Sequence, residues 1–360
     1  MQQARLIVEP DDGTAPILNA IRHAQHTIDL TIFRFDRQDV ASALEAAVAR
    51  GVQVRTLIAF ANRGGVHSLR RLEWRLLDAG AAVARSNDDF ARYHAKLMIV
   101  DRRALHVYGF NLTREDLGSR SFGIITTNRR LAQQATSLFE ADFAHRPYGG
   151  GPDGLVVSPE NARERLEAFV HGARHELLIY DSKLGDRRVL RLLAERVRAG
   201  IAVRIIGHVG KDVGSSRRHP ARHLDAHADK RLESILRGGG DEVATADSSR
   251  SDGRVPRRTD ERANTRLDSQ SIGDAGQRAD VRVARLHHHR LHLRAIVRDG
   301  TVAFIGSQSL RKSELDARRE VGMFVHQPDV VRQIRETFER DWPSGTSDLV
   351  VSAERAGTPP

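Results

Sequence analysis

Residues 44–59 read LEAAVARGVQVRTLIA, and residues 193–208 read LAERVRAGIAVRIIGH. Each stretch has apolar residues at helical spacing, then a glycine, then a run rich in β-branched residues. A glycine directly after the last helical turn is a common helix stop. Gly51 corresponds to Gly200 at an offset of 149 residues. The two stretches therefore predict a duplicated unit in which a helix is followed by a strand.

The duplication extends to the stretches that precede these units. Residues 20–35 read AIRHAQHTIDLTIFRF and residues 169–184 read FVHGARHELLIYDSKL, again at an offset of 149 residues. Repeated alternation of helix and strand is typical of α/β layers. We predict two pseudo-symmetric α/β/α lobes with mostly parallel or mixed sheets, over residues 5–145 and 153–345. The boundary is HRPYGGGPDG (145–154), which is rich in glycine and proline.

A polar motif also occurs once in each half. Residues 93–101 read YHAKLMIVD and residues 290–299 read RLHLRAIVRD, so that each has a histidine, a basic residue and an aspartate in register: His94, Lys96 and Asp101, and His292, Arg294 and Asp299. Their offset is 198 residues, which places 49 additional residues in the second copy. Residues 241–285 carry dense charge and few large apolar side chains, so we expect a disordered surface insertion at about 211–285. We expect a flexible tail over residues 346–360.

The two motifs carry the chemistry of phosphodiester cleavage. Residues i and i+2 of a strand point to the same face, so each histidine projects together with its basic partner. Two cations suit the nonbridging oxygens of a phosphodiester, and two imidazoles suit attack at phosphorus and protonation of the leaving oxygen. Short polar residues in the turns YGFNLT (108–113) and GSQSLR (306–311) complete the expected phosphate site: Asn111, Ser307 and Ser309.

The chain resembles the phospholipase D superfamily in this duplicated pattern. The signature of that family is H-x-K-x4-D in two copies, each followed by a turn similar to G-S-x-N. His94, Lys96 and Asp101 match it fully, whereas the second copy, HLRAIVRD, has Arg294 in place of lysine. The turn GSQS (306–309) has serine in place of asparagine. The resemblance implies two lobes with one shared active-site cleft, and phosphoryl transfer that needs no metal and no cofactor.

The resemblance also implies roles for individual residues. His94 is expected to form a covalent phosphohistidine, and His292 is expected to act as general acid and then as general base. Glu320 follows the second turn and is expected to orient His292, while Ser121 stands at the corresponding place in the first copy. Asp101 and Asp299 belong to the motif, although an aspartate at a strand end also caps turns.

Composition limits the partners. The net charge of +10 favours anionic partners, and the absence of cysteine excludes thiolate chemistry. We find no signal peptide and no transmembrane run, so we expect a monomeric cytoplasmic protein, with peripheral contact to anionic membranes as a further option. The expected substrate is a phospholipid. The alternatives are a nuclease, which the 5% aromatic content does not favour, a phosphatidyltransferase similar to cardiolipin synthase, and a noncatalytic phosphate-binding protein.

Overall fold

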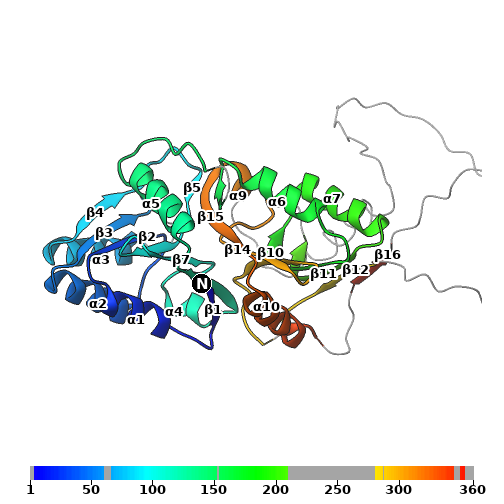
Figure 1. Cartoon of the computed structure of the whole chain (residues 1–360), viewed down its shortest axis with the longest axis horizontal. Helices are drawn as coiled ribbons and strands as arrows, with labels where there is room; N and C mark the ends of the chain where they lie inside the picture. The colour runs from blue at the N-terminus through cyan, green and yellow to red at the C-terminus, as the bar shows by residue number, and fades with distance from the viewer. Residues whose placement is uncertain are drawn as a thin grey trace, which may run out of the picture.

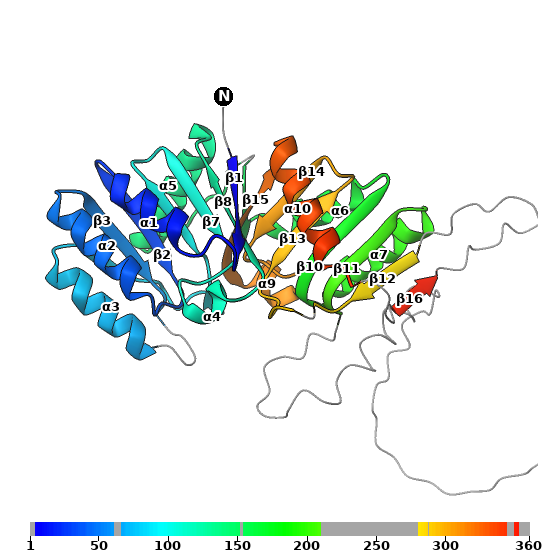
Figure 2. The ribbon, with the colours of Figure 1, turned by 90° about the horizontal axis from the view of Figure 1, so that it is seen from below.

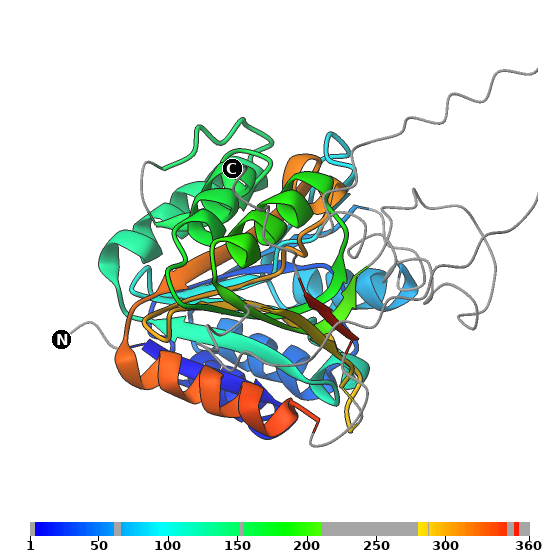
Figure 3. The ribbon, with the colours of Figure 1, turned by 90° about the vertical axis from the view of Figure 1, so that its right-hand side faces the viewer.

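The computed structural model describes residues 4–60, 66–151, 154–209, 280–286, 288–343 and 349–352. These residues form two α/β lobes that lie side by side, each built on one mixed sheet (Figures 1 and 2). Helices cover both faces of the sheets (Figure 3). The predicted fold class is therefore confirmed.

The first lobe contains a seven-stranded sheet of order β1-β8-β7-β6-β2-β3-β4. β2, β3 and β4 run parallel, and the other pairings are antiparallel. Its strands are β1 (Ala4–Glu9), β2 (Thr27–Ile32), β3 (Gln53–Ile58), β4 (Ala82–Arg85), β6 (Leu97–Val100), β7 (Ala104–Tyr108) and β8 (Ser121–Thr126). Its helices are α1 (Ala15–His23), α2 (Gln38–Ala49), α3 (Val66–Asp78), α4 (Arg114–Leu117) and α5 (Arg129–Phe143).

The second lobe repeats this strand order. Its strands follow the order β9-β15-β14-β13-β10-β11-β12, and β16 adds one strand at the β12 edge. The strands are β9 (Leu155–Ser158), β10 (Glu176–Leu184), β11 (Ala202–Val209), β12 (Asp280–Ala284), β13 (Arg294–Arg298), β14 (Val302–Gly306), β15 (Arg318–Val325) and β16 (Leu349–Ser352). The helices are α6 (Ala162–His171), α7 (Arg187–Arg198), α9 (Lys312–Asp316) and α10 (Pro328–Asp341).

Helix α7 shows how the sequence sets these elements. The carboxylate of Asp186 caps its start by accepting the backbone N–H of Arg188 at 3.0 Å and that of Val189 at 3.1 Å. Gly200 follows its last turn with a φ of +91°, a left-handed conformation that other residues adopt at a cost. The apolar positions of the helix are buried on one face: Val189, Leu190, Leu193, Ala194 and Val197. The glycine stop read from the sequence is thus the helix end.

A single hydrophobic core joins the lobes. It contains apolar side chains from the sheets of both lobes and from α5 and α10. At its centre the ring of Tyr180 contacts Phe122 of the first lobe, with centroids 5.7 Å apart, and Phe338 of α10 at 5.0 Å. Each lobe also has one hydrophobic core of its own. In the first lobe it lies under α1, α2 and α3, and in the second lobe under α6 and α7. The shared core fixes the relative position of the lobes.

Two equivalent polar clusters also cross the interface. Each contains an arginine, an aspartate and a tyrosine: Arg319, Asp142 and Tyr93, and Arg120, Asp341 and Tyr180. The arginines and the aspartates are related by an offset of 199 residues, whereas the tyrosines are not at repeat positions. Arg319 Nη2 lies 3.1 Å from Asp142 Oδ1, and Arg120 Nε lies 2.9 Å from Asp341 Oδ2. Each arginine belongs to the other lobe from its aspartate. Breaking such a buried pair leaves one charge without a partner, so these pairs hold the lobes in one arrangement.

Two expectations about the second half need correction. Residues 280–284, at the end of the expected disordered insertion, form β12, which pairs in parallel with β11. Val281 is buried in this strand, and Val283 lies on the same face. Within the expected flexible tail, residues 349–352 form β16, antiparallel to β12. Residues 211–279, 346–348 and 353–360 lie outside the described residues.

Candidate active site

The two histidine motifs meet at the interface because each begins on the other lobe. β5 (Arg92–Tyr93) pairs in parallel with β15, and the backbone N–H of His94 donates to the carbonyl oxygen of Arg319 at 2.8 Å. Reciprocally, the N–H of His292 donates to the carbonyl oxygen of Arg120 at 3.1 Å, beside a bridge between Arg120 and Leu291. Each motif then returns to its own lobe as β6 or β13. This crossing brings residues 198 positions apart to one site.

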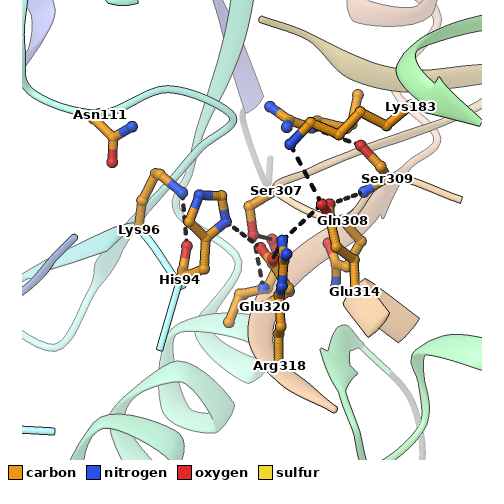
Figure 4. A network of polar contacts seen from close by, with 12 residues as sticks. His94, Lys96, Asn111, Lys183, Ser307, Gln308, Ser309, Glu314, Arg318 and Glu320 are labelled. Atoms are coloured by element: carbon orange, nitrogen blue, oxygen red, sulfur yellow. Dashed lines mark hydrogen bonds and ion pairs between the residues drawn. The ribbon is translucent and has the colours of Figure 1, made fainter. Parts of the chain in front are cut away.

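Glu320 orients His94, not His292. The Nδ1 atom of His94 lies 2.7 Å from Glu320 Oε2, and both side chains are buried (Figure 4). The expectation that Glu320 serves the histidine of its own repeat is therefore wrong. The reason is the strand crossing: His94 sits against β15, on which Glu320 lies. A neutral His94 that donates its Nδ1–H to this carboxylate keeps a lone pair on Nε2 for attack.

His292 has a looser environment. Ser121, which occupies the place equivalent to Glu320, donates its hydroxyl to the carbonyl oxygen of His292 at 2.5 Å and leaves the ring untouched. The Nδ1 atom of His292 lies 3.4 Å from Asp116 Oδ2 and has no hydrogen-bond partner among the described residues. The carboxylate of Asp116 already accepts two hydrogen bonds from Asn111. The two histidines are thus chemically unequal.

The two motif cations are buried beside the histidines. Lys96 is 3% exposed and Arg294 is 2% exposed. Lys96 Nζ donates to the carbonyl oxygen of His94 at 2.7 Å, and Arg294 Nε donates to Ser309 Oγ at 3.1 Å. Arg294 Nη1 has no hydrogen-bond partner within the described part of the chain. A buried guanidinium nitrogen without a partner is costly, and an anionic oxygen would satisfy it.

The turn residues have different surroundings. Ser309 lies against Arg294, as a phosphate site requires. Ser307 instead exchanges hydrogen bonds with the backbone of Val321, accepting at 3.1 Å and donating at 3.3 Å. Asn111 Nδ2 donates to Asp116 Oδ2 at 2.5 Å. Contact with phosphate therefore remains a prediction for all three, and Ser309 has the geometry that favours it.

The motif aspartates lie at the far ends of β6 and β13. The carboxylate of Asp101 accepts the backbone N–H groups of Gln25, His26 and Thr27, and Asp299 accepts those of Arg174, His175 and Glu176. Both aspartates have φ near +50°, which allows this turn. They tie each motif strand to the start of β2 or β10. Their geometry supports the structural alternative and places neither carboxylate beside the histidines.

Burial sets the protonation of the site. Burial, and then the charges of Lys96 and Arg294, hold the pKa of His94 well below its usual value. Burial, Arg294 and Lys96 do the same to the pKa of His292. Burial lowers the pKa of Lys96 to about 7, and burial together with Glu314 raises the pKa of Glu320 to about 7. Because both pKa values are lowered well below 6.5, both histidines are expected to be neutral at pH 7.

Several site residues were not found from the sequence. Phe33 packs edge-on against His94 with centroids 4.6 Å apart, and Lys96 Nζ lies 5.5 Å from the same ring. Asp116 and Glu314 hold the two turns by accepting the backbone N–H of Asn111 and Ser309 at 2.8 Å. The offset of 198 residues links Asp116 with Glu314 and was the signal that could have found them.

A model of the family described as "Cardiolipin synthase, PLD-like domain" matches residues 17–143 and 166–342. The chain belongs to the phospholipase D superfamily. The two matched segments correspond to the two lobes, and each includes one histidine motif. Among curated proteins, none matches this member of the superfamily significantly.

Solved structures share the fold of this superfamily member. Polyphosphate kinase from Porphyromonas gingivalis matches with a TM-score of 0.63 and 18% identity, over 94% of this chain and 50% of the kinase. The chain thus spans about half the length of that protein. Phosphatidylserine synthase from Haemophilus influenzae Rd KW20 matches with a TM-score of 0.63 and 14% identity, over 96% of this chain and 88% of the synthase. At these identities the likeness concerns the fold.

No described helix has the length and apolarity needed to cross a bilayer. Among the described residues, no three histidine or carboxylate side chains gather in a way that would hold a metal ion. His287, the first residue of the HHH tract at 287–289, lies outside the described residues.

Proposed function

We propose that the chain transfers a phosphatidyl group to water or to an alcohol through a covalent phosphohistidine at His94. The observation that carries this proposal is the buried pair of His94 and Glu320, held beside two buried cations at the lobe interface. Of the two histidines, only His94 has a carboxylate hydrogen-bonded to its ring among the described residues; the carboxylate of Asp116 lies 3.4 Å from Nδ1 of His292 without forming a hydrogen bond. This difference supports His94 as nucleophile and His292 as proton carrier.

In the first step, Nε2 of His94 attacks phosphorus while its Nδ1–H is held by Glu320. The N–P bond forms, the P–O bond to the alcohol breaks, and His292 gives its proton to the departing oxygen. In the second step, His292 takes a proton from water or an acceptor alcohol, whose oxygen forms the new P–O bond as the N–P bond breaks. Lys96 and Arg294 balance the charge on the nonbridging oxygens in both steps.

His292 must be protonated to act first as an acid. Its pKa is low in the unliganded site because of burial and the facing cations Arg294 and Lys96. A phosphodiester anion bound between these cations cancels much of their repulsion with the imidazolium. Substrate binding therefore favours protonation of His292, so that His292 carries the proton that it donates to the leaving oxygen.

The substrate class comes from the family. The matching family model carries the description of cardiolipin synthase, and one solved structure of the same fold is a phosphatidylserine synthase. Both names support a phosphatidyl substrate. The net charge of +10 is compatible with an anionic lipid surface.

The test is a panel of phosphodiesters incubated with the purified chain, with and without excess chelator. It contains labelled phosphatidylglycerol, phosphatidylethanolamine, single- and double-stranded DNA, and bis-(4-nitrophenyl) phosphate, with glycerol as acceptor in one arm. We expect release of phosphatidic acid or a new phospholipid, with chelator having no effect. Turnover of DNA alone would establish the nuclease alternative, and no turnover of any member would refute the enzyme proposal.

The pH dependence follows from Glu320 and Lys96, whose pKa values both lie near 7. Below pH 7 Glu320 becomes neutral and no longer accepts the proton of His94. Above pH 7 Lys96 loses the charge that binds phosphate. We expect kcat/KM to peak near neutrality and to fall on both sides. In the Lys96→Arg variant the arginine stays charged above pH 7, so the fall in kcat/KM on the alkaline side should disappear. If that fall is unchanged, Lys96 is not the group that titrates.

A further inference from the structure

Lys183 is a further cation beside the site, outside both histidine motifs. It lies near the end of β10, where the pairing with β11 shifts register between Asp181 and Leu184. Such a bulge re-aims side chains and is common beside active sites. The carboxylate of Asp181 accepts the N–H of Lys183 at 2.7 Å and that of Leu310 at 2.6 Å. Lys183 is thereby fixed next to the turn that carries Ser309.

The ammonium group of Lys183 is only loosely paired. Its Nζ lies 3.7 Å from Glu314 Oε1, beyond hydrogen-bond distance (Figure 4). The side chain is 43% exposed. The same oxygen of Glu314 already receives Arg318 Nη1 at 2.7 Å. Glu314 therefore keeps a partner if Lys183 turns away. An ammonium in this position retains donors for a ligand.

The two lobes differ at this place. At the repeat offset of 149 residues, Phe33 and Arg34 of the first lobe correspond to Ser182 and Lys183. Phe33 is 4% exposed and packs against His94, so it fills its side of the site. Ser182 is smaller and half-buried. Both lobes thus have a basic residue at this place, but Arg34 lies over the Phe33 ring, whereas Lys183 follows the smaller Ser182 and is exposed.

Lys183 lies on the side of His292. β10 pairs antiparallel to β13 with Asp181 opposite Arg294; Lys183 follows Asp181 by two residues and His292 precedes Arg294 by two, so both extend from the same end of this strand pair. The charge of Lys183 is also among those that act on the His292 imidazole. Attack by His94 in line with the leaving oxygen places the alcohol opposite His94, next to His292. The acceptor alcohol of the second step approaches from the same side. Lys183 therefore borders the alcohol and not the diacylglycerol.

We propose that Lys183 forms a subsite for an anionic group on the alcohol that leaves or accepts the phosphatidyl group. The ligand class is an alcohol that carries a carboxylate or a phosphomonoester. This inference rests on the proposed function, because it assigns the alcohol to the side of His292. One charge-assisted hydrogen bond would give a preference of about tenfold to a hundredfold for an anionic over a neutral alcohol.

Binding tests the subsite without turnover. O-phosphoserine and O-phosphoethanolamine differ by one carboxylate, and calorimetry on the whole chain gives the ratio of their Kd values. We expect wild type to prefer O-phosphoserine by tenfold or more, Lys183→Gln to lose this preference, and Lys183→Arg to retain it. Lys312→Gln removes an exposed lysine of α9 and controls for net charge. Equal ratios in wild type and Lys183→Gln, or no binding of either ligand, would overturn the inference.

Turnover provides the second readout. Short-chain phosphatidylserine and phosphatidylethanolamine, used below their micelle concentrations, avoid effects of surface charge. The ratio of their kcat/KM values should fall about tenfold or more in Lys183→Gln, whatever loss both substrates share. If wild type cleaves neither lipid yet discriminates between the free phosphates through Lys183, the subsite stands and the proposed function fails. If turnover occurs with an unchanged ratio, the subsite fails and the proposed function stands.

Discussion

Replacement of His94 by asparagine should lower the proposed phosphatidyl turnover by about 10⁴-fold to 10⁶-fold. Asparagine keeps a polar side chain of similar reach but has no lone pair on nitrogen that can attack phosphorus. Since the histidine is buried and its backbone N–H is bonded to Arg319, the strand pairing should survive. The measurement is phosphate transfer from a labelled phospholipid, with circular dichroism to verify the fold.

The matched variant is His292→Asn, the pseudo-equivalent change. It removes the proton carrier and should slow turnover by about 10²-fold to 10⁴-fold. Because hydrolysis of the intermediate also needs His292, a labelled, acid-labile adduct should accumulate on His94 when the substrate has a good leaving group. An adduct on His292 that accumulates in His94→Asn would reverse the assignment of roles.

Replacement of Glu320 by glutamine should lower kcat by about 10²-fold to 10⁴-fold with a smaller change in KM. The amide keeps the volume of the side chain but can present its NH₂ to Nδ1, which selects the tautomer that protonates Nε2. His94 then has no lone pair toward phosphorus. The acid limb of the pH profile should vanish in this variant because the group that titrates is gone.

Two controls separate orientation from general damage. Glu336→Gln removes an exposed carboxylate of α10 and should leave turnover within about twofold of wild type, as expected for surface substitutions. Ser121→Ala removes the hydroxyl at the place equivalent to Glu320, where the hydroxyl contacts backbone and not an imidazole ring. It should cost far less than Glu320→Gln. Equal losses in Ser121→Ala and Glu320→Gln would contradict the role given to Glu320.

The strand crossing at the interface explains why the sequence assigned Glu320 to the wrong histidine. Within one repeat, Glu320 follows His292 by 28 residues, and the repeat pattern relates the two by position only. Because each histidine motif begins on the other lobe, His94 of the first lobe lies against β15 of the second lobe, which carries Glu320. The same limit applies to β12. Its sequence, DVRVA, contains two charged residues, and only its pairing with β11 identifies it as a strand of the sheet.

The sequence by itself determined the duplication, the α/β class and the two histidine motifs, because helix stops, apolar periodicity and motif spacing are local patterns. Only the tertiary structure decided the position of Lys183 beside the site, the pairing of His94 with Glu320, and the contacts of Asp101 and Asp299 at the strand ends. Each depends on contacts between segments that are far apart in the chain. Hydrogen bonds across a pseudo-twofold interface leave no periodic trace in either repeat, and the packed lobes are what bring their partners together.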